Sequence, residues 1–399
     1  MIARLLCLLL LVLSFTVSTL AQPGSGKLKI TYSKNIETYF LAELLSVDYR
    51  TKNKDWEAFK RRECAAYQPI VNAAIDELKH LESDDIALKT ALLNDTLMSY
   101  GLGNDALMAP LLYHNEFPNK GYRAAYTLRS TSLNEQRQAE VNTLIRRYIE
   151  ELNNFYRTKN VGAFFEKHER FYKGASNEVA QYVNDNMTTA MEQFYGQKKL
   201  GYVVLVSPMM MWPIEDNEGR GIGATVTLPK GDIVYEIMSP YVKVSAADVV
   251  EKQKLFGFDY KPRAEALTIH EFGHSFVNSD VDKFSARITR SDTLFTDTLK
   301  KVMASKGVAS WQVYIIESLV RLGEIRVAER QHDKQRAELL RKYHTNQEHF
   351  IFLPLLESSL KTYEKNRKKY PTFSTFIPDL LDVVERKDKA FVEAQLPKS

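Results

Sequence analysis

Hydrophobic residues recur three and four positions apart from Ile36 to about Tyr195, and again from Ala264 to Arg386. This spacing places apolar side chains on one face of a helix, so it predicts two long helical regions. The periodicity is clearest in residues 70–81, 141–156 and 179–194. Other, shorter segments carry the alternating or continuous apolar pattern of strands. These are residues 28–32, 202–206, 224–228 and 233–238.

The order of these segments predicts an α+β fold. We expect a mainly helical protein with a small mixed or antiparallel sheet before the second helical region and a helical subdomain at the C-terminus. Gly219, Gly221 and Gly223 precede the segment 224–228, at a spacing that fits neither the dinucleotide-binding nor the P-loop fingerprint. We therefore expect these glycines to form a flexible turn that leads into the next strand.

The first 21 residues have the pattern of a secretory signal peptide. Arg4 precedes an apolar run, Leu5–Val17, which is too short to span a bilayer comfortably. Thr19 and Ala21 are the small residues that a cleavage site requires. We expect cleavage after Ala21 and a secreted or periplasmic protein without a stable membrane anchor. The expected organisation is a signal peptide (1–21), a mainly helical N-terminal region (22–195) and a second region (196–399) with the chemistry described below.

Composition excludes several classes of function. The chain has 54 Lys and Arg against 50 Asp and Glu, a net charge of +4, which provides no basic patch for nucleic acid. Its two cysteines are Cys7 and Cys64, and the first lies in the predicted signal peptide. The mature chain would keep one thiol, which excludes an intramolecular disulfide framework and a cysteine-based zinc finger.

One segment of the second helical region combines metal-binding residues with a residue that can accept a proton. In Thr268–Asn278, the pattern His-Glu-x-x-His places His270 and His274 one turn apart on one helix face, so both imidazoles can bind one metal ion. Glu271 projects about 100° away from His270 and can instead accept a proton from metal-bound water. This arrangement is that of the zincins. Gly273 costs roughly 1 kcal/mol in a helix, which indicates a close approach to the helix there.

A catalytic zinc needs a third protein ligand, and the helix 311–326 offers two carboxylates. Glu317 lies among apolar neighbours, where a carboxylate is unfavourable unless it is paired or bound to metal. A salt bridge with Arg321, one turn later, is the alternative explanation. Glu324 lies on the same face where the helix becomes polar, and we expect it to be near solvent. We therefore predict that Glu317 is the ligand. The metzincin pattern is excluded, because no Gly-x-x-His follows the motif.

The two motifs resemble a known group. His270-Glu271-Phe-Gly-His274, followed by Glu317 on a second helix, resembles the gluzincin branch of zinc metallopeptidases. With the flanking segments Ser-Phe-Val-Asn and Ser-Leu-Val-Arg and the export signal, the chain resembles the DUF4932 family of secreted bacterial proteins over about residues 28–380. The resemblance implies a zincin-like fold, Zn²⁺ bound by His270, His274 and Glu317, and Glu271 as the general base. Thermolysin-type gluzincins carry Asp where this chain has Arg321, so the residues that orient the ligand histidines are not predicted.

These residues predict a secreted zinc-dependent peptidase, a hydrolase of peptide or protein substrates, with 196–399 as the zincin-like catalytic region. Zinc would polarise the scissile carbonyl while Glu271 takes a proton from the metal-bound water. An extended substrate would pair with an edge strand, either 224–228 or 233–238. Two other functions stay open: a secreted binding protein with a structural or degenerate zinc site, and a helical interaction protein without metal. Candidate donors to the oxyanion are Tyr314, Tyr343, His344 and His349.

Overall fold

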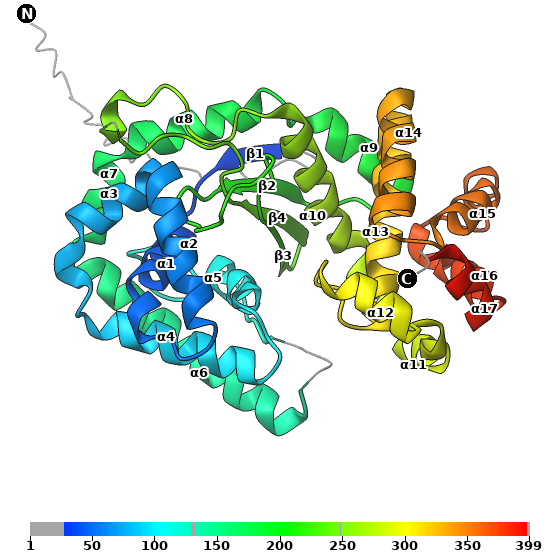
Figure 1. Cartoon of the computed structure of the whole chain (residues 1–399), viewed down its shortest axis with the longest axis horizontal. Helices are drawn as coiled ribbons and strands as arrows, with labels where there is room; N and C mark the ends of the chain where they lie inside the picture. Colours follow the sequence, from blue (N-terminus) through cyan, green and yellow to red (C-terminus); the bar gives the residue numbers. More distant parts are fainter. Residues whose placement is uncertain (1–27, 129–132, 248, 397–399) are drawn as a thin grey trace, which may run out of the picture.

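The computed structural model shown in Figure 1 describes residues 28–128, 133–247 and 249–396, so the predicted signal peptide lies outside the described residues. The described chain is mainly helical, with one sheet in the strand order β1-β2-β4-β3. The strands β1 (Leu28–Thr31), β2 (Gly201–Val206) and β4 (Gly231–Met238) are parallel, and β3 (Gly221–Leu228) pairs antiparallel with β4. The predicted α+β fold with a small mixed sheet is confirmed.

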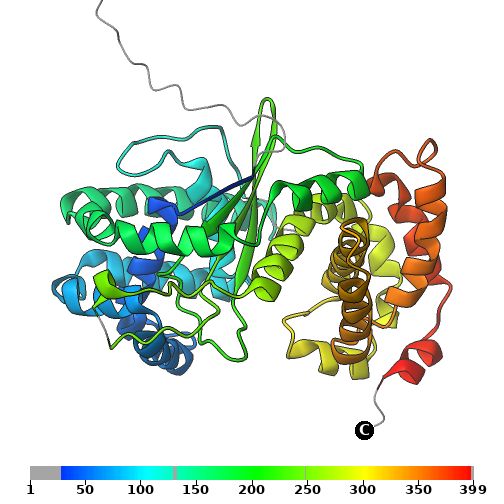
Figure 2. The same ribbon diagram turned by 90° about the horizontal axis from the view of Figure 1, so that it is seen from above.

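The sheet separates two hydrophobic cores. Successive side chains of a strand point to opposite faces, so Val204 and Val234 belong to one core, and Leu205 and Ile233 to the other. The helices before residue 168 cover the face of Leu205 and Ile233. The helix α9 (Asp185–Tyr195) belongs to the core on the other face, together with α10 (Lys261–Asp282) and α13 (Trp311–Arg330). Figure 2 shows the sheet nearly edge-on between these two groups of helices.

The N-terminal helices agree with the predicted periodicity, with one exception. Residues 70–81 and 141–156 lie within α3 and a following short 3₁₀ turn, and within α6. The segment 179–194 is not one helix, because α8 ends at Ala180 and Asn184 starts α9 by accepting a hydrogen bond from the Asn186 amide (3.0 Å). The helices are α1 (Lys34–Leu45), α2 (Lys54–Tyr67), α3 (Pro69–Glu77), α4 (Asp85–Ser99), α5 (Met108–Tyr113), α6 (Glu135–Thr158), α7 (Val161–Lys167), α8 (Glu169–Ala180) and α9 (Asp185–Tyr195).

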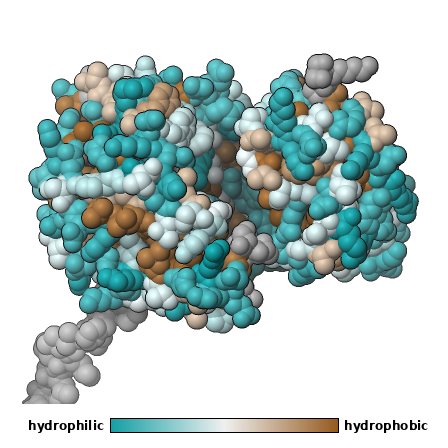
Figure 3. All heavy atoms as spheres, turned by 60° about the horizontal axis from the view of Figure 1, so that its bottom comes forward, coloured by the Kyte–Doolittle hydropathy of each residue, from teal (hydrophilic) through white to brown (hydrophobic). Residues whose placement is uncertain are grey.

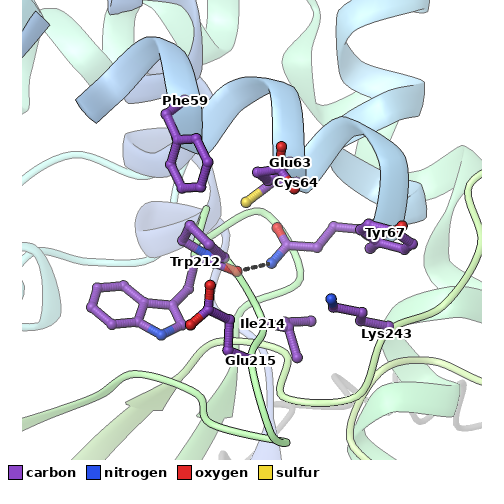
Figure 4. Close-up of a pocket in the computed structure, with 10 residues that line it drawn as sticks. Phe59, Glu63, Cys64, Tyr67, Trp212, Ile214, Glu215 and Lys243 are labelled. Carbon is purple, nitrogen blue, oxygen red and sulfur yellow. Dashed lines mark hydrogen bonds between the residues drawn. The ribbon is translucent and has the colours of Figure 1, made fainter. Parts of the chain in front are cut away.

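A side-chain hydrogen bond connects the N-terminal helices to the segment that follows β2. Gln68, just after α2, donates a hydrogen bond from its side-chain amide to the Trp212 carbonyl (3.0 Å). Figure 4 shows this contact in a small pocket of about 40 Å³ that Cys64 and Lys243 also line. Cys64 is a buried free thiol, and burial raises its pKa to about 12. The thiol is therefore protonated and unreactive at neutral pH.

Two helices of the C-terminal half, α10 and α13, pack closely together. A Cβ atom added at Gly273 of α10 would lie 3.1 Å from the Val320 side chain of α13, so the close approach predicted at this glycine is that of the second helix. No helix in the described part of the chain is long and apolar enough to cross a membrane. The remaining helices are α11 (Ser285–Arg290), α12 (Asp297–Ala304), α14 (Lys334–Lys342), α15 (Leu353–Lys365), α16 (Ile377–Glu385) and α17 (Lys389–Gln395).

Candidate metal centre

The packing of α10 against α13 brings together the three residues predicted as metal ligands. His270 Nε2 lies 3.2 Å from His274 Nε2 and 3.6 Å from Glu317 Oε2, and His274 Nε2 lies 3.5 Å from Glu317 Oε1. One ligand atom from each residue lies within 4.8 Å of the others, and all three residues are partly buried. This His-His-Glu cluster could hold a metal ion.

The two histidines are oriented through their other ring nitrogens. His270 Nδ1 donates to Glu324 Oε1 (2.9 Å), and His274 Nδ1 donates to Asn278 Oδ1 (2.9 Å). With a proton on each Nδ1, the Nε2 atoms are the ones that would bind a metal ion, which displaces any proton they carry. Glu324 and Asn278 are therefore the orienting residues that the sequence did not predict. The signals were present, because Asn278 lies one turn after His274 and Glu324 lies two turns after Glu317.

Glu324 is not near solvent, so that expectation is wrong. The residue is 5% exposed, because the sequence around it turns polar on other faces of α13 while its own face stays against α10. Its second oxygen accepts from His344 Nε2 (3.1 Å). Burial alone would raise the pKa of Glu324, but His344 and His270 outweigh it and hold the pKa well below the usual range. Glu324 is a buried anion between two imidazoles.

Arg321 links Glu317 to a second layer of charges. Its guanidinium contacts Glu317 Oε2 and binds Glu348 Oε2 (2.8 Å). The salt bridge considered as the alternative explanation of Glu317 is therefore present, together with the approach of Glu317 to both histidines. Burial raises the pKa of Glu317, and the surrounding His270, Arg321 and His274 lower it below its usual value. Glu317 is thus an anion, as a metal ligand must be.

His344 completes this layer from an irregular turn. It lies in a π-helical turn, residues Tyr343–Gln347, that follows α14. Its Nδ1 contacts Glu348 Oε2 (2.6 Å) while its Nε2 contacts Glu324, so both ring nitrogens are occupied. Burial alone would lower the pKa of His344, but Glu324 and Glu348 raise it above its usual value. For His270, burial opposes the carboxylates of Glu324 and Glu317, which raise its pKa to about 9.

Glu271 lies against the strand β3, and two glycines make room for it. A Cβ atom at Gly221 would lie 2.6 Å from Glu271 Oε1, and a Cβ atom at Gly223 would lie 3.0 Å from Glu271 Oε2. Both glycines are part of β3 rather than of a flexible turn, so the prediction is wrong for these two, while Gly219 lies in the irregular segment before the strand. The strand begins earlier than its apolar pattern because glycines contribute no side chain to that pattern. Their physical role is to let the strand pass beside the Glu271 side chain.

The sheet decides between the two strands considered for substrate pairing. β4 lies between β2 and β3 and is paired on both sides, whereas β3 lies at one edge of the described sheet, opposite the edge formed by β1. β3 runs beside α10, between the N-terminal and C-terminal parts of the molecule. The molecular surface is hollowed between these two parts (Figure 3). Gly223, on this edge strand, is exposed.

The structure narrows the candidate donors to an oxyanion. The hydroxyl of Tyr314 is buried and bonded to the His349 carbonyl (3.1 Å) and the Ile351 amide (2.9 Å), and His344 is held between two carboxylates. These two side chains have no free donor. Tyr343 is 44% exposed and remains available, as does the partly exposed His349.

A buried carboxyl behind α10 was missed by the sequence reasoning. Glu236 belongs to β4, where it pairs in register with Gly223 and so shares the face of the sheet toward α10. Both of its oxygens are buried without a hydrogen-bond partner among the described residues. Burial raises its pKa well above the usual value. Its apolar neighbours in sequence gave no signal of this environment.

A family model described as a domain of unknown function (DUF4932) matches residues 128–383, more than half of the chain, including α10 and α13. No curated protein and no solved structure matches the chain. The resemblance that the two motifs indicated is confirmed at the level of the family. This chain belongs to the DUF4932 family.

Proposed function

We propose that the chain is a secreted zinc-dependent peptidase, with His270, His274 and Glu317 as zinc ligands and Glu271 as general base. The observation that carries the proposal is the convergence of one ligand atom from each of His270, His274 and Glu317. Glu271, on the same helix as the two histidines, packs against the edge strand β3. Export is part of the proposal and rests on the sequence of residues 1–21.

The donor set and its spacing fit zinc. Zinc–nitrogen and zinc–oxygen bonds of about 2.0–2.1 Å in tetrahedral geometry put neighbouring ligand atoms about 3.3 Å apart. The three separations are 3.2, 3.5 and 3.6 Å, close to that value. Three protein ligands leave a fourth position open, which is the pattern of catalytic rather than structural sites. A zinc ion held there would supply Lewis-acid polarisation of a carbonyl and a more acidic water molecule.

The residues of the chain would divide the remaining work of amide hydrolysis. Glu271, which directly follows His270 in the sequence, is partly buried and would hold the proton taken from the attacking water, then deliver it to the leaving amine. Glu324 and Asn278 would keep the two imidazoles in their ligand orientation. Arg321 would hold Glu317 in place from the side of Glu348. Tyr343 or His349 would donate to the developing oxyanion.

The edge of β3 gives this site a means to bind peptides. An extended peptide can add to a sheet edge as a further strand, with affinity from main-chain hydrogen bonds. Gly223 is exposed and lies beside Glu271, so a peptide on this edge would pass the base. This geometry favours peptide or protein substrates over small amides, which would gain nothing from the strand.

Metal content and peptide cleavage test the proposal together. The protein without residues 1–21 should contain about one zinc per chain by elemental analysis, and should cleave members of a mixed peptide library analysed by mass spectrometry. Glu271→Gln should keep the zinc and lose cleavage, because the amide cannot accept the proton. Glu265→Gln is the matched control on the same helix, since Glu265 pairs with Arg336 (3.1 Å) and should leave cleavage intact.

The alternatives give different results in the same experiment. Stoichiometric zinc without cleavage of any peptide would favour a binding protein with a structural or degenerate site. Absence of zinc after refolding with excess metal would favour an interaction protein in which the ion pairs of Arg321 replace the metal. The presence of Glu271 argues against the structural site, because such a site needs no base and favours four protein ligands.

A further inference from the structure

The outward-facing backbone groups of β3 can be assigned from its register. The Ser239 amide donates to the Arg220 carbonyl (2.9 Å), so this pair, next to Gly221 and Met238, is hydrogen-bonded. Antiparallel pairs alternate between bonded and non-bonded. Every second residue of β3 therefore turns its N–H and C=O away from β4, toward the free edge. These residues are Gly221, Gly223, Thr225 and Thr227.

The last of these outward pairs is already occupied. The hydroxyl of Tyr113, at the end of α5, accepts from the Thr227 amide (2.7 Å) and contacts the Thr227 carbonyl (3.4 Å). Tyr113 is 5% exposed, and its ring packs against Tyr126 at 4.6 Å between centroids. Its own carbonyl accepts from the Arg123 amide (2.8 Å). Tyr113 is thus fixed through both its hydroxyl and its backbone carbonyl, and its side chain covers the edge of β3 at Thr227.

The preceding outward pairs are open. Within the described residues, nothing is bonded to the outward N–H and C=O of Gly223 and Thr225, and Gly223 is exposed. Gly223 lies beside Glu271, while Thr225 and Thr227 follow at about 7 and 13 Å along the strand. A peptide that pairs antiparallel with β3 would run from the Thr227 end toward Glu271. The residues on the N-terminal side of its scissile bond would therefore lie along Gly223–Thr227.

We propose that Tyr113 ends the peptide-accepting edge of β3 after Thr225, so that main-chain recognition covers only the residues opposite Gly223, Ala224 and Thr225. This inference rests on the proposed peptidase function and specifies its substrate. The bound peptide forms main-chain hydrogen bonds over about three residues on the N-terminal side of the scissile bond and none beyond them. Tyr113 is then a specificity-determining residue, and it lies outside residues 128–383, the part matched by the family model.

A length series of one cleaved peptide tests the limit. Residues are added one at a time on the N-terminal side, and kcat/KM should rise until about three are present and then change less than twofold. N-methylation of single amides gives the register. Methylation of the residues opposite Gly223 and Thr225 should cost a few-fold to tenfold, whereas methylation of the residues opposite Ala224 and Thr227 should cost less than twofold.

Two variants test whether Tyr113 causes the length limit. Tyr113→Ala should uncover Thr227 and extend the rise in kcat/KM to five residues, whereas Tyr126→Ala, the matched control, keeps the Tyr113 hydroxyl and the shorter limit. Circular dichroism checks that both variants are folded. If they are not, the peptide length series on the wild-type protein still tests whether recognition ends after about three residues. A kcat/KM that keeps rising with peptide length, or equal losses at all methylated positions, would overturn this inference and leave the proposed peptidase function standing. If no peptide is cleaved, the proposed function fails, and anisotropy of the labelled series still tests the limit on binding.

Discussion

Replacing Gly221 with Ala should separate catalysis from stability at this site. The added Cβ would lie 2.6 Å from Glu271 Oε1, 2.7 Å from its Cγ and 3.0 Å from its Cδ. Ordinary carbon–oxygen and carbon–carbon contacts are about 3.4–4.0 Å, so the Glu271 side chain must move by roughly 1 Å. These three neighbours are side-chain atoms rather than backbone, so rotation about the side-chain bonds of Glu271 can relieve the contact while the strand stays in place.

Gly221→Ala should reduce the rate of catalysis much more than the stability of the fold. A misplacement of about 1 Å can reduce a rate by about 10²-fold, and complete loss of a general base costs about 10²–10⁴-fold. Stability should change by less than about 1 kcal/mol, because Ala restricts the unfolded chain more than Gly and offsets the cost of moving Glu271. Zinc binding should be unchanged, since the three atoms nearest to the added Cβ all belong to Glu271 and not to a proposed ligand.

Three measurements on the variant decide the matter. These are kcat/KM on a cleaved peptide, zinc content, and the denaturant midpoint of unfolding. Glu271→Gln sets the floor of activity. Wild-type kcat/KM in Gly221→Ala would refute the assignment of Glu271 as the base held by β3. A large loss of stability or zinc would show instead that the methyl group displaces α10 from the sheet.

Two further predictions concern the metal and the pH dependence of stability. Glu324→Ala, which frees the His270 ring, should lower the zinc affinity about 10–100-fold. Glu317→Ala, which removes a proposed ligand, should lower it more. Competition with a chromophoric chelator measures both affinities, and a larger loss in Glu324→Ala would reverse the ligand assignment. Burial raises the pKa of Glu37 from 4.5 to about 8 in the folded protein, so its contribution to stability is complete below about pH 4.5 and is lost as the pH rises through 8. Glu37→Gln can keep the contacts with Ser207 and the Met209 amide, and should therefore match the wild type at pH 4 and exceed its free energy of unfolding by about 3 kcal/mol at pH 7. An equal difference at both pH values in urea titrations would contradict the titration of Glu37.

The sequence by itself determined those features that depend on local geometry. Helical periodicity alone places His270 and His274 on one face one turn apart, whatever the surrounding fold. Short β-branched runs also identified all strands of the described sheet, to within a few residues at their ends. The family assignment followed from the same two motifs, because these segments of α10 and α13 carry the chemistry of the site.

Only the tertiary structure decided what depends on partners distant in sequence. Strand order is set by pairing between segments, so the sequence left two strands as possible edges and the sheet selected β3. The polar residues after Glu324 predicted exposure, but His344, twenty residues later, buries that carboxylate and pairs with it. Glycines carry no hydrophobic signal, so the role of Gly221 appeared only when the helix that carries Glu271 packed against it. Local patterns report which face of an element is apolar, and packing determines what that face meets.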